Sequence, residues 1–199
     1  ESAIVFDEVH SFDTRLFSAL LGFLREFDVP ALCMTASLPP NRLEQLRESG
    51  LEIFPKNPQD FSDLWEKSSA LRYRIHLTTK EAAVEEAAEA WRQGEKILWV
   101  VNTVKRCQEV AEELSSMLPK AKVICYHSRF RLKDRQARHK ELIAAFRANG
   151  PMIAVTTQVC EMSLDLSAAL LISEFAPLTA LIQRMGRCNR KAKVDKIGK

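Results

Sequence analysis

Short apolar runs alternate with longer segments of helical periodicity along most of the chain. The apolar runs predict buried strands at 3–6, 31–34, 96–101, 122–126, 152–155 and 170–173. The periodic segments between them predict helices at 12–27, 39–49, 81–93, 103–117, 132–148 and 178–185. A weaker polar–apolar alternation predicts one more strand at 73–77. Strands that alternate with helices in this way favour an α/β fold with a mostly parallel sheet.

The strand–helix pattern restarts near residue 78, so we expect two lobes, 1–77 and 78–199. The first lobe shows only two clear strands, at 3–6 and 31–34, too few for a complete doubly wound domain. Glu1 leads directly into an apolar run, and a native protein seldom begins inside a buried strand. We therefore expect a first lobe that is truncated at its N-terminal side and a second lobe that is truncated at its C-terminus.

Composition indicates an ordinary soluble protein, because 46% of the residues are hydrophobic and 28% are charged. No apolar run approaches the roughly 20 residues of a membrane helix, and no signal peptide opens the chain. We expect a cytoplasmic protein with no membrane partner. The net charge of +3 is compatible with nucleic-acid binding without arguing for it, since the net value hides the distribution of charge.

Five cysteines are widely spaced, without a Cys-x-x-Cys pair, and most lie in apolar surroundings. This pattern favours buried, reduced thiols over disulfides or a zinc site. They are Cys33, Cys107, Cys125, Cys160 and Cys188.

Two acids in the tetrad Asp7-Glu8-Val9-His10 follow the first predicted strand. Ligands of parallel sheets bind at this end of the strands. One carboxylate there can hold Mg²⁺ through water, and the other can orient and deprotonate an attacking water. That division of labour suits hydrolysis of a nucleoside triphosphate. An ordinary strand end that runs into an acidic turn is the equally open alternative.

Small hydroxyl residues end the second predicted strand in Thr35-Ala36-Ser37. One strand–helix–strand unit separates them from the acids, which would put both sites on neighbouring strand ends. Their side chains can then hydrogen-bond to the acidic site or transmit its state. Serine and threonine are also common turn and cap residues, so the motif alone is weak.

The most specific stretch runs from Gln183 to Arg190 and reads Gln-Arg-Met-Gly-Arg-Cys-Asn-Arg. On a helix, Gln183, Arg187 and Arg190 would lie on one face at i, i+4 and i+7. Guanidinium groups suit phosphate oxygens that gain charge in a transition state. A solvated basic surface helix is the alternative.

Polar residues follow two strands of the second lobe. Asn102-Thr103 predicts an anion site at a helix N-terminus, with a plain N-cap as the alternative. Thr156 and Thr157 can hydrogen-bond to a phosphodiester backbone through their hydroxyls and backbone amides. Asp165 can accept from a ribose hydroxyl or orient an arginine. A polar loop is the alternative for each of these residues.

The densest basic stretch, 127–140, includes Arg129 and predicts salt-sensitive phosphate contacts without sequence preference. Phe130 can stack a base, although an anchor to the core is the better interpretation. His127 is read as a loop residue rather than a catalyst.

The order of these motifs resembles that of the superfamily-two helicases. Within that superfamily the chain resembles the CRISPR-associated DEVH helicase–nuclease of type I interference systems. The features that carry the resemblance are Asp-Glu-Val-His before Ser-Phe-Asp, the His-Ser-Arg-Phe block with Asp134-Arg135, and Thr-Gln-Val-Cys-Glu-Met-Ser-Leu-Asp-Leu ahead of 183–190. The resemblance covers nearly the whole chain. It implies a RecA-like parallel sheet flanked by helices, the second helicase lobe, preceded by a truncated part of the first RecA-like lobe.

The resemblance also implies a role for each matching residue. Asp7 would bind Mg²⁺, Glu8 would activate water, and Arg187 and Arg190 would be arginine fingers that contact ATP. The remaining roles are coupling of the ATP site to DNA movement (His10, Thr35, Ser37), nucleotide binding (Asp165, Gln183) and single-stranded DNA binding (Asn102, Thr103, Arg129, Thr156, Thr157).

The family's partners are the CRISPR surveillance complex of the Cascade type and a single DNA strand. Its members move 3′ to 5′ and cut with a separate metal-dependent HD nuclease domain.

The chain departs from the family in three ways. It has no Gly-x-x-x-x-Gly-Lys-Ser/Thr phosphate loop, no HD motif, and Ser167-Ala168-Ala169 where acids are common. We therefore expect no ATP hydrolysis by this chain alone. A non-catalytic RecA-like binding module and a DEVH-type RNA helicase are the alternatives.

Overall fold

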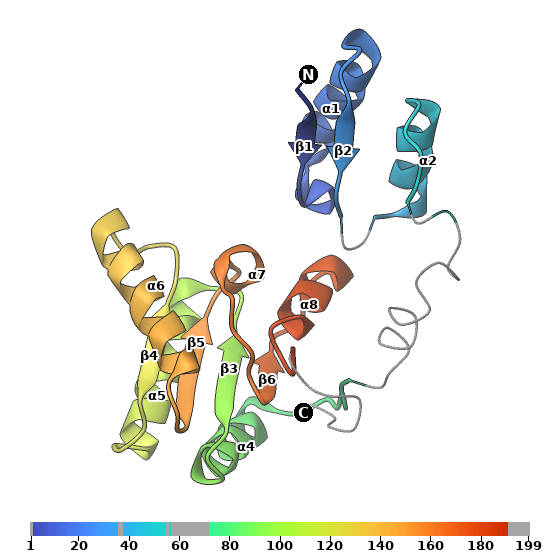
Figure 1. Cartoon of the computed structure of the whole chain (residues 1–199). Helices are drawn as coiled ribbons and strands as arrows, with labels where there is room; N and C mark the ends of the chain where they lie inside the picture. Colours follow the sequence, from blue (N-terminus) through green and yellow to red (C-terminus); the bar gives the residue numbers. More distant parts are fainter. Residues whose placement is uncertain (1, 36–37, 55, 57–71, 191–199) are drawn as a thin grey trace. The chain divides into compact units, whose positions relative to one another are not determined.

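The structure is a computed structural model that describes residues 2–35, 38–54, 56 and 72–190. It divides into two compact units, Glu1–Ser68 and Ser69–Lys199 (Figure 1). The predicted lobe boundary between residues 77 and 78 stays a prediction. Among the described residues, no helix combines the length and the apolar composition needed to cross a membrane.

The first unit contains a two-stranded parallel sheet in which Ile4 pairs with Ala31 and Phe6 with Cys33. Asp13 caps the crossover helix by accepting a hydrogen bond from the Leu16 amide at 2.8 Å. The described elements are β1 (Ile4–Phe6), the 3₁₀ turn η1 (Val9–Ser11), α1 (Thr14–Glu26), β2 (Ala31–Cys33) and α2 (Pro40–Glu48).

The strands of this unit are half-exposed, so the prediction that 3–6 and 31–34 are buried is wrong for this chain. Phe6 and Cys33 pack against the cluster around Phe17 and Leu20. Val5 and Leu32 stay 55% and 54% exposed. Alternate residues of a strand point to opposite faces, and the described helices of the unit cover only one face.

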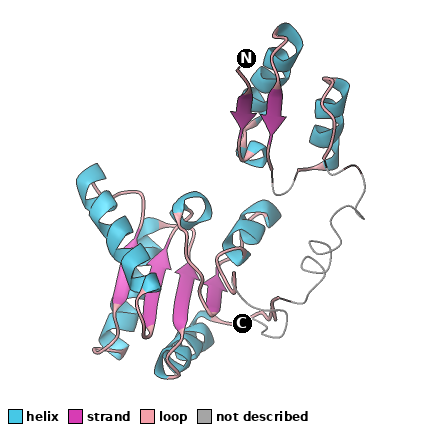
Figure 2. Ribbon diagram, in the orientation of Figure 1, coloured by secondary structure: helices cyan, strands magenta, loops and turns pink. Residues whose placement is uncertain are grey.

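The second unit contains a four-stranded, fully parallel sheet in the order β4-β5-β3-β6 (Figure 2). Its strands are β3 (Lys96–Val100), β4 (Val123–Tyr126), β5 (Met152–Thr156) and β6 (Leu170–Ser173). Its helices are α4 (Lys80–Arg92), α5 (Val104–Met117), α6 (Leu132–Arg147), α7 (Val159–Ser163) and α8 (Leu178–Met185).

Helices pack on both faces of this sheet, which explains why its strands are almost continuously apolar. On β3, Ile97 and Trp99 belong to the cluster with α4 and α5. Leu98 and Val100 belong to the cluster with α6 and α7. All four side chains are at most 3% exposed. The sheet is therefore a rigid support for the loops at its ends.

The predicted elements of the second unit are confirmed to within a residue or two at each end. Gly94 closes α4 with φ 85°, a left-handed conformation that glycine adopts without strain. One prediction fails: the segment 73–77 is not a strand, since only Tyr73 makes an isolated bridge. The short helix α7 is not predicted from the sequence, because five residues are too few to show helical periodicity.

Candidate functional site

The acids Asp7 and Glu8 are exposed at the carboxyl end of β1. The Glu8 amide donates to Asp7 Oδ1 at 2.8 Å, and the Ser11 hydroxyl donates to the Glu8 carbonyl at 2.8 Å. Glu8 adopts φ 53°, a left-handed conformation that is uncommon outside glycine. Backbone strain of this kind tends to collect at functional positions.

His10 connects the two strand ends of the first unit. Its Nε2 lies 3.3 Å from Glu8 Oε2, and its Nδ1 lies 3.2 Å from the Thr35 hydroxyl. Because a carboxylate only accepts, His10 Nε2 is the donor to Glu8. The His10 side chain is only 6% exposed, so these contacts fix the ring. The predicted proximity of the acids and Thr35 is confirmed, while Ser37 lies outside the described residues.

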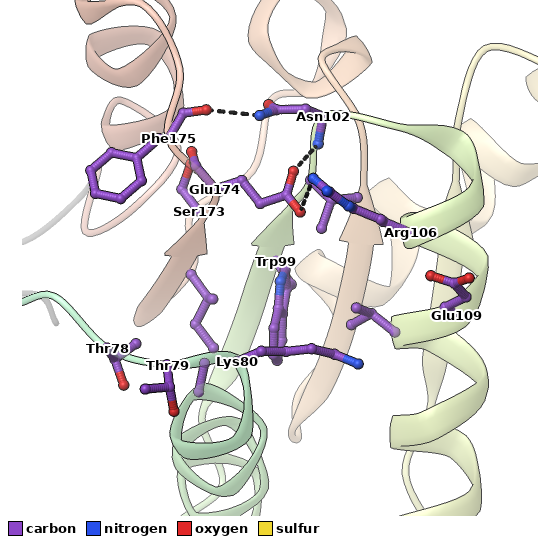
Figure 3. Close-up of a pocket in the computed structure, with 14 residues that line it drawn as sticks. Thr78, Thr79, Lys80, Trp99, Asn102, Arg106, Glu109, Ser173, Glu174 and Phe175 are labelled. Carbon is purple, nitrogen blue, oxygen red and sulfur yellow. Dashed lines mark hydrogen bonds and ion pairs between the residues drawn. The ribbon is translucent and has the colours of Figure 1, made fainter.

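The carboxyl edge of the larger sheet gathers Asn102, Thr157 and Glu174, which follow β3, β5 and β6. The Glu174 carboxylate accepts from the backbone N–H of Asn102 at 2.7 Å and from Arg106 Nη1 at 3.1 Å (Figure 3). Thr103 caps α5 by accepting from the Arg106 amide. The protein's own carboxylate thus lies beside the helix N-terminus where an anion site was predicted.

A cavity of about 560 Å³ opens beside this carboxylate, between the N-terminal ends of α4 and α5 (Figure 3). Trp99 and Ile172 form its apolar wall, and Lys80, Arg106 and Glu174 supply charge at its margin. Lys80 and Arg106 are each paired with a carboxylate, Glu113 and Glu174 respectively.

Arg184 is the buried centre of this edge, and sequence reasoning missed it. Its guanidinium is 1% exposed and donates to Glu161 Oε1 at 2.8 Å, to Ser173 Oγ at 3.0 Å, to the Glu174 carbonyl at 3.2 Å and to Asn102 Oδ1 at 3.1 Å. The position follows Leu181 by three, which places it on the same side of α8. This three-residue spacing from an apolar residue is the feature of the sequence that could have indicated burial of Arg184.

The prediction that Gln183, Arg187 and Arg190 share one helical face is wrong. Helix α8 ends at Met185, Gly186 forms its C-cap, and the two arginines follow in turns. Glycine is a poor helix former, which explains why the helix stops.

The two arginines consequently have different surroundings. Arg187 donates to the Cys160 carbonyl at 3.2 Å and the Glu161 carbonyl at 2.7 Å, both on α7. Arg190 is exposed and donates to Asp165 Oδ1 at 2.8 Å. Asp165 therefore orients an arginine in the structure, which is one of the two interpretations of this residue. Gln183 is half-buried on α8.

Thr156 and Thr157 are 0% and 2% exposed. Thr156 Oγ1 donates to the Thr157 carbonyl at 3.2 Å. Neither hydroxyl faces solvent, so a phosphate contact would need the main chain or a movement of this loop. Their role stays a prediction.

In the basic stretch, Arg129 is exposed and His127 is buried. The His127 ring stacks on Phe130 with centroids 4.2 Å apart and planes at 5°. The stack favours Phe130 as an anchor of the loop rather than a platform for a base. Burial and the nearby Arg129 lower the pKa of His127 and hold it neutral, and its Nδ1 has no hydrogen-bond partner.

All five cysteines are free thiols; Cys107, Cys160 and Cys188 are buried as predicted, whereas Cys33 and Cys125 are half-buried. Burial raises the pKa of Cys160 to about 12 and that of Cys188 to about 11. Cys107 and Cys125 lie with their sulfur atoms 3.5 Å apart. The hydrogen-bond contact with Cys107 lowers the pKa of Cys125, whereas burial raises the pKa of Cys33.

A family model described as the C-terminal part of the CRISPR-associated nuclease/helicase Cas3 matches residues 93–193. A putative CRISPR-associated nuclease/helicase Cas3 of Myxococcus xanthus is 44% identical over 198 residues, which are 98% of this chain and 26% of that protein. The chain thus spans about a quarter of the length of that relative.

Two solved structures extend the comparison. The T. fusca Cas3–AMPPNP structure is 25% identical with a TM-score of 0.73, and the match covers 95% of this chain and 27% of that one. A chain of a CRISPR RNA-guided surveillance complex in a pre-nicking state is 23% identical with a TM-score of 0.70, covering 94% and 28%. The likeness confirms the predicted RecA-like α/β fold.

The opposite pKa shifts of two half-buried cysteines predict different reactivity. The thiolate is the nucleophile, so the lower pKa of Cys125 should let it react with iodoacetamide at lower pH than Cys33. Peptide mass spectrometry across a pH series measures both rates in one sample. Replacing Cys107 with alanine removes this hydrogen bond and should shift the Cys125 profile to higher pH. Identical profiles for Cys33 and Cys125 would contradict the prediction.

Proposed function

The chain belongs to the CRISPR-associated nuclease/helicase Cas3 family, and we propose that it forms part of an ATP-driven motor that moves 3′ to 5′ on single-stranded DNA in CRISPR defence. The observation that carries the proposal is the Glu8–His10–Thr35 contact. It links a carboxylate able to activate water to the end of a neighbouring strand. A link of this kind is what a motor needs to convert hydrolysis into movement.

Asp7 and Glu8 supply the hydrolytic chemistry in this proposal. Mg²⁺ keeps several waters and takes one or two carboxylates, which fits the exposed Asp7. In the described part of the chain, no group of three or more acidic, histidine or cysteine side chains could hold a metal ion by itself. The metal would neutralise charge on ATP phosphates when bound. Glu8 orients and deprotonates the attacking water. Its contact with His10 couples this site to Thr35 at the end of the neighbouring strand.

The second unit supplies the remaining nucleotide contacts. Arg187 and Arg190 stabilise phosphate charge, and Gln183 and Asp165 assist in binding the nucleotide. The support is that Arg190 is exposed with Asp165 holding its guanidinium, while two carbonyls of α7 hold Arg187. Arginine held in this way needs little reorganisation to meet a charged oxygen.

Single-stranded DNA lies along the carboxyl edge of the larger sheet, with Asn102, Thr103, Arg129, Thr156 and Thr157 as the contacting residues. Ligands of open parallel sheets bind at this edge. Thr103 and Arg129 are already exposed there. The two buried threonines would act through their backbone amides or after a movement of the loop.

The partners in this proposal are the CRISPR surveillance complex and an HD nuclease domain of the parent protein. The support is that one similar chain occurs in a surveillance complex, and that the M. xanthus relative is named a nuclease/helicase. The cytoplasm is the corresponding location.

The 199-residue chain alone should hydrolyse no ATP, because its sequence has no phosphate loop whose amides and lysine would hold the β- and γ-phosphates. Phosphate release with and without Mg²⁺ tests this, with Glu8→Gln as the matched variant. A magnesium-dependent activity that Glu8→Gln abolishes would refute the prediction.

The chain should bind single strands weakly, with little sequence preference and strong dependence on salt. If about three phosphates are neutralised, a fourfold rise in salt lowers the affinity about twentyfold. Anisotropy of labelled oligo-dT and mixed-sequence strands at two salt concentrations measures both properties. Arg129→Gln should weaken binding and reduce the salt slope. Arg92→Gln, at the C-terminal end of α4, is the control and should change neither. Salt-independent or strongly sequence-specific binding would count against the proposal.

A further inference from the structure

Arg184 is first among the largest fully buried side chains of the described residues, and it is charged. Placing an isolated charge in a protein interior is costly, so such a residue persists only where its partners satisfy it. Glu161 supplies the opposite charge at 2.8 Å. The remaining guanidinium donors are directed to the ends of two different strands.

The guanidinium joins three segments that are far apart in the sequence. Its Nε binds Glu161 on α7, its Nη1 binds Ser173 and Glu174 at the end of β6, and its Nη2 binds Asn102 after β3. The guanidinium, a planar and rigid fork of N–H donors, binds all of these partners at once and so fixes their relative positions. Lysine cannot reproduce this pattern, because it presents its donors from a single nitrogen.

The bond to Asn102 determines which end of that amide faces each neighbour. Asn102 Oδ1 accepts from Arg184 at 3.1 Å. Its Nδ2 donates to the Phe175 carbonyl at 2.7 Å, as Figure 3 shows. An amide nitrogen carries two hydrogens, and the Phe175 carbonyl takes one of them. A flipped amide would bring its nitrogen against the guanidinium and its oxygen against the carbonyl. Arg184 therefore keeps Oδ1 of Asn102 turned toward the guanidinium and Nδ2, the donor atom, turned away from it.

We propose that Arg184 is a positioning residue for DNA binding, which orients the Asn102 amide so that its second N–H can donate to a phosphate oxygen. The inference rests on the proposed function, in which Asn102 contacts single-stranded DNA. Arg184 itself is too deeply buried to touch the strand. Loss of the guanidinium removes one of the two hydrogen bonds that hold the side-chain amide and leaves only the Phe175 carbonyl, so the second N–H is less well oriented toward a phosphate oxygen.

A double-mutant cycle separates positioning from a general contribution to the fold. We would measure oligo-dT affinity and the urea midpoint for wild type, Arg184→Lys, Asn102→Ala and the double variant. Arg92→Lys is the matched control, since Arg92 is exposed and its partner Glu89 lies on the same helix. Two mutations that act through one contact are non-additive, whereas independent effects add.

Arg184→Lys and Asn102→Ala should each weaken oligo-dT binding about tenfold, the equivalent of one hydrogen bond to a charged group. The double variant should bind no more weakly than Asn102→Ala alone. Arg92→Lys should bind like the wild type. If the two losses multiply in the double variant, or if Arg184→Lys binds normally, the proposal is overturned. If the wild-type chain binds no DNA at all, the proposed function fails and the positioning role fails with it.

A second variant covers the case in which Arg184→Lys fails to fold. Glu161→Gln leaves an oxygen for Arg184 Nε and removes only the charge that holds the fork. It should weaken oligo-dT binding severalfold with a folded circular dichroism spectrum, again with no further effect in the Asn102→Ala background. A folded Glu161→Gln variant with unchanged affinity would overturn the proposal.

Discussion

The parallel direction of the paired strands is the constraint on which both candidate sites depend. In parallel strands every carboxyl end reaches the same edge, so the residues that follow each strand become neighbours. This brings Thr35 to His10 in the first unit, and Asn102 to Glu174 in the second. Helices on both faces of the larger sheet keep that edge in place, because the central strand β5 is buried throughout and the central strand β3 is buried except at Lys96.

Glu174 and Arg184, at the carboxyl edge of the larger sheet, are satisfied within the protein before any ligand binds. Glu174 accepts from Asn102 and Arg106, and Arg184 is surrounded by acceptors. Such networks favour one arrangement of the loops, since a charge left without partners in the interior would be costly. A strand of DNA or a nucleotide would therefore meet donors whose directions are already set.

The sequence alone predicts the elements of the second unit well, because long apolar and periodic runs dominate them. It also predicts that Asp7–His10 and Thr35 are neighbours, since strand–helix–strand units are right-handed and short. Prediction from the sequence fails where the local pattern and the observed structure differ, at the end of α8 and at Arg184. In the sequence, the helical spacing of 178–185 continues to Arg190, but in the structure Gly186 ends the helix. Arg184 was overlooked because a charged residue in a basic run is normally expected at the surface, and its partners come from distant segments.

The most direct test of the account is amide hydrogen exchange of the chain with and without saturating oligo-dT. If the carboxyl edge of the larger sheet binds the strand, exchange should slow at 102–106, 157–161 and 173–175, the segments that Arg184 and Glu174 hold together. The opposite edge, at 93–96, 119–122 and 148–151, should be unchanged. Slower exchange confined to that opposite edge, or no change at either edge with DNA bound, would contradict the account.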